Sequence, residues 1–332
     1  MRTVQLSHGG GGEETNDLIR DLFYHNFKND ILIKAEDAAV LEVEKKIAFT
    51  TDSFTVSPIF FNGGDIGKLA IAGTVNDLAM MGAKPLYLSA AFMIEEGLSY
   101  EELEIIVKSM AKELEKSGAK IVCGDTKVVP KGSVDKIFIN TAGIGEILRE
   151  DISVLNIKEG DVIIASRDVG CHGATILMKR EGLDVSADLK SDCETLWPAV
   201  EGLINENISI SAMRDATRGG ISAVLNEWAT SSEVCLEIEE SAVEISDEVR
   251  GICEIFGFEA MDFANEGTFI LAVAPMHAAL ALDLLKKYDF CKNAAAIGCV
   301  TQKYPAKVVL HSSYGSSRFL DLPKGELLPR IC

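Results

Sequence analysis

Segments of strand length alternate with segments of helix length along the whole chain, and this alternation limits the possible folds more than any other feature. The first half predicts strands at residues 38–43, 46–51, 120–123 and 136–144, and helices at residues 15–27, 67–81 and 100–117. The second half predicts strands at residues 162–166, 234–238, 268–273, 294–300 and 306–310, and helices at residues 173–181, 191–205, 220–231, 246–256 and 276–288. Both halves therefore indicate an α/β (α+β) fold. No internal repeat of about 20 to 50 residues is present, which excludes solenoids and propellers.

A polar connection at residues 148–161 interrupts this pattern between the two halves. A chain of 332 residues is long enough for two domains. We therefore expect an N-terminal domain at residues 1–150, a C-terminal domain at residues 151–320 and a tail at residues 321–332.

The charge balance and the cysteines limit the possible partners. The 32 Lys and Arg residues are scattered among 51 acidic residues, so the formal net charge is -19 and no basic patch for nucleic acid or anionic lipid is formed. No run of about 18 apolar residues and no signal peptide is found. The eight cysteines include no C-x-x-C pair, which indicates reduced thiols. We expect a cytoplasmic protein that binds neither nucleic acid nor membrane.

The chain ends in a cysteine on a segment that contains Pro323, Gly325 and Pro329. Such a segment cannot continue a helix or join the middle of a sheet, so it predicts a mobile tail. A thiol is the best side-chain nucleophile near neutral pH, and on a mobile tail Cys332 could reach more than one site. A frayed terminus that happens to end in cysteine is the simpler alternative.

Four acidic residues in the first half follow or interrupt apolar segments: Asp37, Asp52, Asp77 and Asp125. Burial of an unpaired carboxylate costs several kcal/mol, and few cations lie nearby in the sequence. The pattern therefore indicates bound Mg²⁺, which commonly shares its ligands with nucleotide phosphates. Capping of helices or turns is the alternative, and it is weakest for Asp77, whose neighbours in the predicted helix are almost all apolar.

Two further features of the first half are consistent with phosphate binding. His8 precedes a run of four glycines that begins with Gly9 and Gly10, and the main-chain N–H groups of such a run can contact phosphate. The run lacks the Walker spacing, and a flexible leader is the alternative. Lys127 follows Asp125 by two residues and could neutralise charge on a transferring phosphoryl group, although a surface lysine is equally compatible with the pattern.

The second half contributes a candidate anion site and a candidate base. Arg214, Asp215 and Arg218 precede a Gly-Gly pair at a predicted helix start, which is typical of an anion or carboxylate clamp. Glu266 lies at the start of a predicted strand, where partial burial would raise its pKa and favour a role as a base, with a turn acid as the alternative. Cys171 and His172 could resemble a catalytic Cys/His pair. Because adjacent side chains on one turn rarely face each other, we expect a structural role for both residues.

Together these segments resemble the PurM-like (aminoimidazole-ribonucleotide synthetase) superfamily of ATP-using enzymes and, within it, the HypE family of hydrogenase maturation factors. The resemblance covers nearly the whole chain. It is carried by residues 6–9 (LSHG), 37–41 (DAAVL), 51–58 (TDSFTVSP), 61–70 (FNGGDIGKLA), 73–83 (GTVNDLAMMGA), 124–129 (GDTKVV), 214–215 (RD), 217–220 (TRGG), 264–267 (ANEG) and 328–332 (LPRIC). The closing pentapeptide separates this family from its relatives.

The resemblance implies a PurM-like two-domain fold in which the N-terminal domains of a homodimer form a shared β-barrel, with ATP sites near that interface. It also implies a carbamoyl dehydratase: HypF places a carbamoyl group on Cys332, ATP drives its dehydration to a thiocyanate, and the cyanide passes to iron held by HypC and HypD for a [NiFe]-hydrogenase. Glu266 would be the base and Lys127 would stabilise developing phosphate charge. Mg²⁺ would be held by the four acids named above, and ATP by these acids together with His8, Gly9, Gly10, Asn76, Thr126, Arg214, Asp215 and Arg218.

Two other functions are compatible with these motifs. Another superfamily member, such as a selenophosphate synthetase or thiamine-monophosphate kinase, would phosphorylate a free small molecule and would leave Cys332 without a purpose. A non-catalytic carrier would only shuttle a group on its tail, and it would not need Asp77, Lys127 or Glu266.

Overall fold

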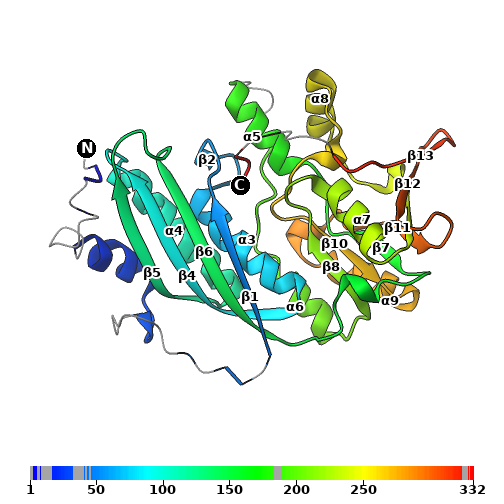
Figure 1. Ribbon diagram of the computed structural model, residues 1–332, viewed down its shortest axis with the longest axis horizontal. Helices are drawn as coiled ribbons and strands as arrows, with labels where there is room; N and C mark the ends of the chain where they lie inside the picture. Colours follow the sequence, from blue (N-terminus) through cyan, green and yellow to red (C-terminus); the bar gives the residue numbers. More distant parts are fainter. Residues whose placement is uncertain are drawn as a thin grey trace.

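Two β-sheets, one from each half of the chain, organise the protein (Figure 1). The computed structural model describes residues 3–5, 8, 17–32, 41, 43–44, 46–182, 189–323, 328 and 330–332. Each sheet is covered by helices of its own half, and the C-terminus returns to the region between the halves (Figure 1). The predicted α/β fold class is confirmed.

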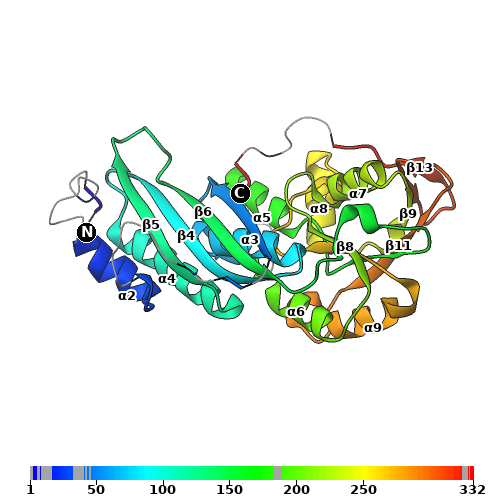
Figure 2. The same cartoon turned by 60° about the horizontal axis from the view of Figure 1, so that its bottom comes forward.

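Within the described residues, the first sheet has the strand order β1-β6-β4-β5. Its strands are β1 (Ile47–Phe54), β4 (Ala83–Glu95), β5 (Lys120–Val129) and β6 (Ile137–Ile147). The helices α3 (Ile66–Met80) and α4 (Tyr100–Ser117) cover one face of this sheet, as Figure 2 shows. The remaining elements of this half are the π-type turn η2 (Ile19–Tyr24), α2 (His25–Phe27), β2 (Phe60–Phe61) and β3 (Gly64–Asp65).

Helix α3 is apolar on almost every side because protein surrounds it. It packs against β1, β4 and β6 on one side, against α4 on another, and against α6 (Trp197–Asn205) and β8 (Ile210–Asp215) of the second half. The side chain of Asp65 caps its N-terminus by accepting hydrogen bonds from the main-chain N–H groups of Gly67 (2.7 Å) and Lys68 (3.0 Å). This central helix therefore joins the two halves and carries Asp77 to their boundary.

The second sheet has the strand order β13-β12-β9-β11-β7-β10-β8 in the part of the chain that the structure describes. Besides β8, its strands are β7 (Val162–Ala165), β9 (Cys235–Glu239), β10 (Phe269–Val273), β11 (Ala295–Thr301), β12 (Lys307–His311) and β13 (Ser317–Phe319). The other helices of this half are α5 (Cys171–Glu181), α7 (Gly220–Ser231), α8 (Asp247–Phe256) and α9 (Pro275–Leu285). Short 3₁₀ turns occur at Val154–Asn156, Glu240–Ala242, Ala260–Asp262 and Asp289–Cys291.

One large hydrophobic core runs through both halves. It continues from the helix-covered face of the first sheet, through α3 and α6, to one face of the second sheet. A second core lies beneath α7 on the other face of the second sheet, and a third joins α5 to α8. Because the main core is continuous, the two halves pack against each other through α3 and α6.

Most predicted elements are present, and the differences have local causes. Helix α4 has the predicted bounds of residues 100–117. The central strand β4 was missed because Pro85 and several small residues weaken its strand pattern, and the pairing with β6 shifts register after Pro85. The helix predicted from residue 191 begins only at Trp197, because main-chain groups before it bond to other parts of the protein. The strand predicted at residues 38–43 lies largely outside the described residues.

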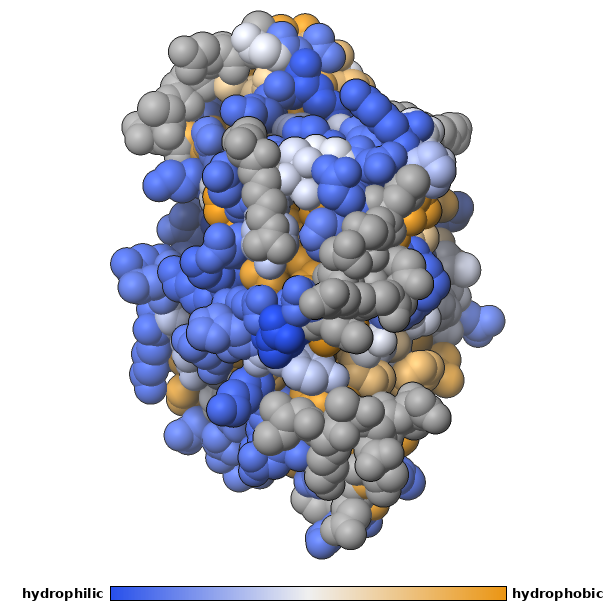
Figure 3. Space-filling view, turned by 90° about the vertical axis from the view of Figure 1, so that its left-hand side faces the viewer, coloured by the Kyte–Doolittle hydropathy of each residue, from blue (hydrophilic) through white to orange (hydrophobic). Residues whose placement is uncertain are grey.

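The face of the first sheet that points away from α3 carries exposed apolar side chains. Phe49 is 67% exposed, Ile47 is 46% exposed and Met93 is 39% exposed. Elsewhere the surface is more polar: Figure 3 shows a mostly hydrophilic end of the molecule, with smaller apolar areas between the charged residues. Among the described residues, no helix has the length and apolar character needed to cross a membrane.

Candidate functional site

The end of the tail is docked between the two halves of the chain. Its main chain pairs antiparallel with residues 55–57, which follow β1. The Thr55 N–H donates to the Cys332 main-chain oxygen at 2.8 Å, and the Ser57 N–H donates to the Arg330 carbonyl oxygen at 3.2 Å. The Thr55 hydroxyl also donates to the Cys332 oxygen at 3.2 Å. This pairing sets the register of the last three residues.

Two arginines reinforce the pairing. The Arg180 guanidinium group, on α5, donates to the carbonyl oxygens of Ser57 and Arg330, both at 2.6 Å. Arg330 donates to the Thr55 carbonyl oxygen at 2.9 Å and to the Asp135 carboxylate at 2.8 Å, and it stacks over the Phe138 ring at 5.4 Å. The tail is therefore bound to elements of both halves.

His172 holds the penultimate residue. Its Nε2 lies 2.7 Å from the Ile331 carbonyl oxygen and its Nδ1 lies 2.8 Å from the Ser191 hydroxyl. The Ile331 side chain is only 4% exposed and belongs to the main core. Cys171 does not pair with His172, because its thiol donates instead to the Asp168 carboxylate at 2.8 Å. The expectation that Cys171 and His172 do not face each other is confirmed.

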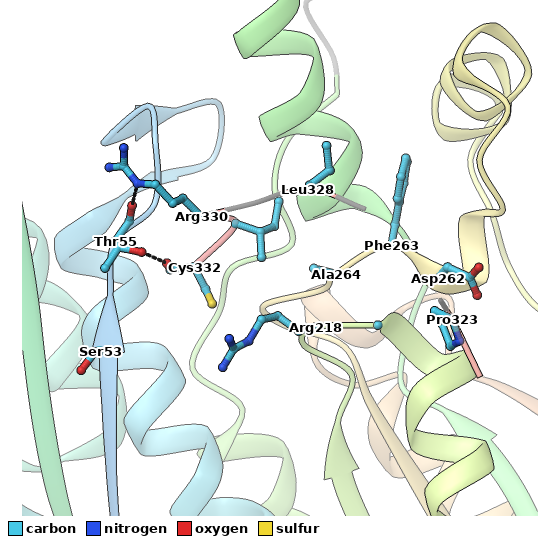
Figure 4. A pocket seen from close by; sticks show the side chains of 12 residues that line it. Ser53, Thr55, Arg218, Asp262, Phe263, Ala264, Pro323, Leu328, Arg330 and Cys332 are labelled. Atoms are coloured by element: carbon cyan, nitrogen blue, oxygen red, sulfur yellow. Dashed lines mark hydrogen bonds between the residues drawn. The ribbon is translucent and has the colours of Figure 1, made fainter. Parts of the chain in front are cut away.

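The docked cysteine lines a pocket of about 470 Å³ between the halves. Figure 4 shows its sulfur pointing into the space that Arg218 faces from the other side. Ser53 and Thr55 form the wall from the first half, and the loop before α7 and residues 262–264 form the wall from the second half. Pro323 and Leu328 of the tail segment complete the lining.

Burial and two carboxylates keep the docked thiol protonated. Burial raises the pKa of Cys332 to about 12, with the negative charges of Glu266 and Asp52 adding to the effect and Arg218 opposing it. A thiol with this pKa is a poor nucleophile at neutral pH. A free thiol would therefore react faster from an undocked tail.

Four acidic side chains from both halves form a cluster, and two of them, Asp52 and Glu266, are close enough to act on this thiol. Asp52 (β1) and Asp77 (α3) come from the first half, and Asp215 (β8) and Glu266 come from the second. Burial raises the pKa of Asp215 to about 7, and the nearby charges of Asp77 and Asp52 contribute. Burial also raises the pKa of Glu266 well above its ordinary value, together with Asp215 and Asp192. The arrangement is a cluster of like charges that favours protonation or a neutralising cation.

One acid of this cluster, Asp77, is anchored by a hydroxyl group. The Thr50 hydroxyl donates to the Asp77 carboxylate at 2.6 Å. Burial raises the pKa of Asp77, and this hydrogen bond opposes the rise. The sequence-based expectation that Asp77 lies inside an apolar helix is confirmed by its position in α3.

A single chain does not bring all the predicted metal ligands together. The pairing of strands places Asp125 in one row with Ala91, Asn140 and Ser53 on the open face of the sheet, whereas Asp52 points to the helix-covered face. Asp125 is exposed and bonds to Lys127 at 2.7 Å. Asp37 lies outside the described residues. Among the residues that the structure describes, no three His, Cys, Asp or Glu side chains are placed to hold one metal ion.

The other predicted nucleotide-binding residues are spread over the molecule. His8 lies near the N-terminal segment that bonds to Leu98, and Gly9 and Gly10 lie outside the described residues. The Asn76 side chain bonds to the main chain of Glu194 (3.0 Å) and Leu196 (2.8 Å). Thr126 is on β5. Arg214 is exposed and pairs with Glu227 at 2.5 Å, whereas Arg218 lines the pocket. Their roles in nucleotide binding stay predictions.

Several residues at this site were not singled out by sequence reasoning. Arg180, Asp135 and Ser191 contact the tail or its support through hydrogen bonds between distant parts of the chain. Isolated charged or polar residues of this kind give no local sequence signal. Arg330 did have a signal, because it belongs to the closing pentapeptide that carries the family resemblance.

Both halves of the chain match known families of one class. Residues 35–147 match the family "AIR synthase related protein, N-terminal domain", and residues 158–311 match "AIR synthase related protein, C-terminal domain". The two matches together cover most of the chain and agree with its two sheets. The fold and site thus define a two-domain protein of the AIR synthase (PurM-like) class.

Comparison with individual proteins identifies a group within this class. The chain is 44% identical to carbamoyl dehydratase HypE of Escherichia coli K12 over 100% of both chains. The crystal structure of hydrogenase maturation protein HypE in complex with ATP superimposes with a TM-score of 0.96 at 44% identity, covering 99% of this chain and 100% of that one. HypE from a crystal structure of the HypE-HypF complex gives a TM-score of 0.81 at 44% identity, covering 92% and 99%. The chain therefore belongs to the AIR synthase related family and, within it, to the HypE group of hydrogenase maturation proteins.

A more distant likeness shows how widely the fold is used. Thiamine monophosphate kinase from Aquifex aeolicus has a TM-score of 0.63 at 18% identity, covering 90% of this chain and 97% of that one. At this identity the likeness extends to the fold alone.

Proposed function

We propose that this protein dehydrates an S-carbamoyl group on its own Cys332 to an S-cyanate (thiocyanate), in a reaction driven by ATP. The observation that carries the proposal is the docked tail, which brings the Cys332 sulfur into the pocket that Arg218 also lines, close enough to Glu266 for its charge to raise the pKa of the thiol. A protein that phosphorylates a free metabolite has no need of a cysteine whose tail is held there by hydrogen bonds to Thr55, Arg180 and His172. The activity named for the E. coli relative is the same dehydration class.

The residues can meet the demands of this chemistry. The carbamoyl group would be joined to the Cys332 sulfur by an S–C bond, and its conversion to S–C≡N removes the oxygen and both protons of the nitrogen, the elements of one water. ATP, when bound, supplies a phosphoryl group that turns the amide oxygen into a good leaving group. Glu266 would accept a nitrogen proton in its ionised form, which a cation bound at the acidic cluster would favour, and its raised pKa makes that carboxylate a stronger base than an ordinary glutamate. Arg218 would stabilise negative charge that develops at the pocket.

The acidic cluster fits a bound Mg²⁺ only in part. Asp52 and Asp77 are close enough for each to affect the other's charge, and their raised pKa values indicate a site that a cation would stabilise. Mg²⁺ commonly takes one or two carboxylates and completes its shell with phosphates and water. We therefore assign Asp52 and Asp77 as its ligands in one chain, with nucleotide phosphates as the others.

Lys127 and Asp125 would join the site through a second copy of the chain. In one chain both residues lie on the open face of the first sheet, on the strand farthest from β1. The same face exposes Phe49, Ile47 and Met93, which a partner would cover. We propose a homodimer in which the first sheets of two chains meet through this face and form a shared β-barrel. In this dimer, Lys127 of one chain would contact the nucleotide phosphates bound by the other chain.

The proposed partners follow from the same reaction. A HypF-type carbamoyltransferase would load the thiol, and a HypC-HypD complex would receive the cyanide for its iron; a crystallised relative is itself in complex with HypF. Loading would use the undocked tail, because the docked thiol is protonated and enclosed. All these steps would take place in the cytoplasm, where thiols stay reduced.

Intact-mass spectrometry after incubation with the HypF-type partner, carbamoyl phosphate and ATP tests the proposal. The expected result is a gain of about 43 Da on the thiol and then a loss of about 18 Da during ATP turnover, as for carbamoylation of a nucleophilic cysteine followed by dehydration. Cys332→Ala should show neither change, whereas Cys299→Ala, which removes an exposed thiol elsewhere, should behave as the wild type.

The same experiment separates the alternatives. A small-molecule kinase would form no adduct on Cys332, and its nucleotide turnover would be unaffected by Cys332→Ala. A non-catalytic carrier would gain about 43 Da without the later loss, because transfer alone needs no base. Either result contradicts the dehydratase.

A further inference from the structure

Residues 189–196, here called the strap, form an extended segment between α5 and α6 that lies across the boundary of the two halves. The strap is bound to the first half by main-chain groups. Ser191 N–H donates to the Asn62 carbonyl oxygen at 2.8 Å, and Leu196 N–H donates to the Asn76 side chain at 2.8 Å. Thr195 N–H donates to the buried carboxylate of Glu113 at 3.0 Å. These bonds tie the strap to helices α3 and α4.

One side chain of the strap reaches the loop that carries the proposed base. Asp192 is only 2% exposed. Its Oδ1 accepts the N–H of Glu266 at 3.1 Å, and its Oδ2 accepts the N–H of Gly267 at 3.0 Å and the hydroxyl of Thr268 at 2.8 Å. Three donors from consecutive residues therefore converge on one buried carboxylate, which is the pattern expected for a residue that fixes a loop.

The loop and the strap are also in direct main-chain contact. Glu194 N–H donates to the Glu266 carbonyl oxygen at 3.2 Å, so both sides of the Glu266 main chain are held. A Cβ atom at Gly267 would lie 1.8 Å from the Asp192 carbonyl oxygen, so the approach requires glycine. The sequence predicts the Asn265-Glu266-Gly267 triplet at the start of a strand, with Glu266 as a candidate base and a turn acid as the alternative; it gives no sign of the close contact with residues about 75 positions earlier.

The bonds to Asp192 and Glu194 hold the main chain of Glu266 and leave one oxygen of its carboxylate unpaired. Its Oε1 is buried and makes no hydrogen bond to any residue that the structure describes. An unpartnered carboxylate oxygen in a closed site is costly unless a ligand completes it. We propose that Asp192 is the positioning residue for Glu266: by binding the main-chain N–H groups of Glu266 and Gly267 and the hydroxyl of Thr268, it aims a carboxylate with an unpaired oxygen at the group on Cys332. This inference rests on the dehydration proposed above.

The charge of Asp192 gives the proposal a measurable signature. Glu266 is surrounded by Asp192 of the strap, Asp215 of β8, Asp52 of β1 and Asp77 of α3, and each of them raises its pKa. The thiols of Cys332 and Cys193 lie nearby, with Arg218 beside the first and Lys68 beside the second. Removal of one negative charge from this set lowers the pKa of Glu266. A residue that merely supported the fold would change stability without moving this titration.

The test is a single-turnover measurement of dehydration on protein already carbamoylated by the HypF-type partner, recorded across pH for wild type, Asp192→Asn and Glu194→Gln. Glu194 is the matched control because Glu194→Gln keeps its main-chain bond to Glu266, and its side chain pairs with Lys68 and Lys116 and is not among the charges that raise the pKa of Glu266. We expect Asp192→Asn to slow the step by about 10- to 100-fold, as misplacement of a catalytic group does, and to lower the pH midpoint. Glu194→Gln should match the wild type in the rate of dehydration and in its pH midpoint.

Loading of Cys332 by the partner should be equally fast in all three proteins, because it precedes the step that needs the base. A wild-type rate in Asp192→Asn, an unchanged midpoint, or an equal loss in Glu194→Gln overturns the inference.

If Asp192→Asn does not fold, Thr268→Val takes its place. This variant keeps the charge of Asp192 and removes one of its three hydrogen-bond donors, so the rate of dehydration should fall by about 3- to 10-fold at an unchanged pH midpoint. A wild-type rate for that variant also overturns it. Wild-type protein that loads but never dehydrates contradicts the proposed function itself, which is a separate result.

Discussion

The imidazole of His172 lies 2.7 Å from the carbonyl oxygen of Ile331, so one buried side chain of α5 binds the tail next to its terminal cysteine. Burial lowers the pKa of His172, which keeps the ring neutral. A neutral ring that donates from Nε2 must accept at Nδ1, where the Ser191 hydroxyl lies at 2.8 Å. The docked tail is thus linked to the strap through this ring.

Replacement of His172 by alanine should release the tail. Loss of the hydrogen bond to Ile331 costs about 1 to 1.5 kcal/mol, which raises the undocked fraction about tenfold. Because the undocked thiol regains an ordinary pKa, iodoacetamide should alkylate Cys332 about ten times faster, as followed by peptide mass spectrometry. The exposed Cys299 provides an internal reference.

Lys179→Ala is the control for this variant, since Lys179 lies on the same helix and is exposed. It should leave the alkylation rate of Cys332 unchanged. Equal rates in wild type and His172→Ala would mean that the bond to Ile331 does not hold the tail.

The sequence predicted the fold well where local patterns are strong. Helix α4 is amphipathic and was placed correctly, and Asp77 was correctly assigned to an apolar helix. Strand β4 was missed, because Pro85 and its small residues weaken its own pattern and its place depends on pairing with β5 and β6. Strand pairing of this kind forms only when segments distant in the sequence meet, so no local pattern predicts it.

The candidate site was predictable to a similar degree. Glu266 and Cys332 were identified from their motifs, and Arg218 lines the same pocket as the thiol. The strap was predicted as part of a helix, since Ser191 and Asp192 are common at helix starts. Its extended form depends on bonds to Asn76 and Glu113 more than 80 residues away. The role of Asp192 could therefore not be predicted from the chain alone.

Substitution of Phe49 by glutamate should prevent dimer formation. The Phe49 side chain is 67% exposed on the open face of the first sheet, where the proposed dimer would bury it. A charge at that position would have to be desolvated, which costs several kcal/mol. Size-exclusion chromatography with light scattering should give twice the chain mass for wild type and the single chain mass for Phe49→Glu.

Met276→Glu is the control for the dimer, because Met276 is 83% exposed on α9, in the other half of the chain. It should keep the wild-type mass. A monomeric wild type, or a dimeric Phe49→Glu, would place the interface elsewhere.

Asp215 should make the nucleotide-free protein less stable as pH rises from about 4 to about 7. Its folded-state pKa is about 7, against 3.8 for the unfolded chain, so the native state binds the proton more tightly in that window. Deprotonation therefore costs stability, by about 4 kcal/mol at most. Asp215→Asn removes this group and should raise the thermal midpoint at pH 8 relative to wild type.

The control for this titration is Asp125→Asn. Asp125 is exposed, and its hydrogen bond from Lys127 lowers its pKa, so it cannot produce a loss of stability with rising pH. Scanning calorimetry of the three proteins between pH 4 and pH 8 makes the comparison. If wild type and Asp215→Asn lose stability in parallel, another acid of the cluster is responsible.

Gly67 allows α3 and α4 to approach closely, and its replacement by alanine should destabilise the protein. A Cβ atom there would lie 2.4 Å from the Ile106 carbonyl oxygen and 2.9 Å from the Met110 side chain, both on α4. The helices would have to separate, and overpacking of this kind costs about 1 to 3 kcal/mol. Urea unfolding should show a lower midpoint with an unchanged slope.

Gly251 provides the matched control, because it also lies inside a helix, α8, but a Cβ atom there would meet nothing within 4 Å. Gly251→Ala should raise stability by about 0.5 to 1 kcal/mol through the better helix propensity of alanine. The two substitutions are chemically identical, so opposite signs would isolate the packing of α3 on α4. A stabilised Gly67→Ala would show that the two helices can separate without cost, and the close contact would then have no part in holding Asp77 at the site.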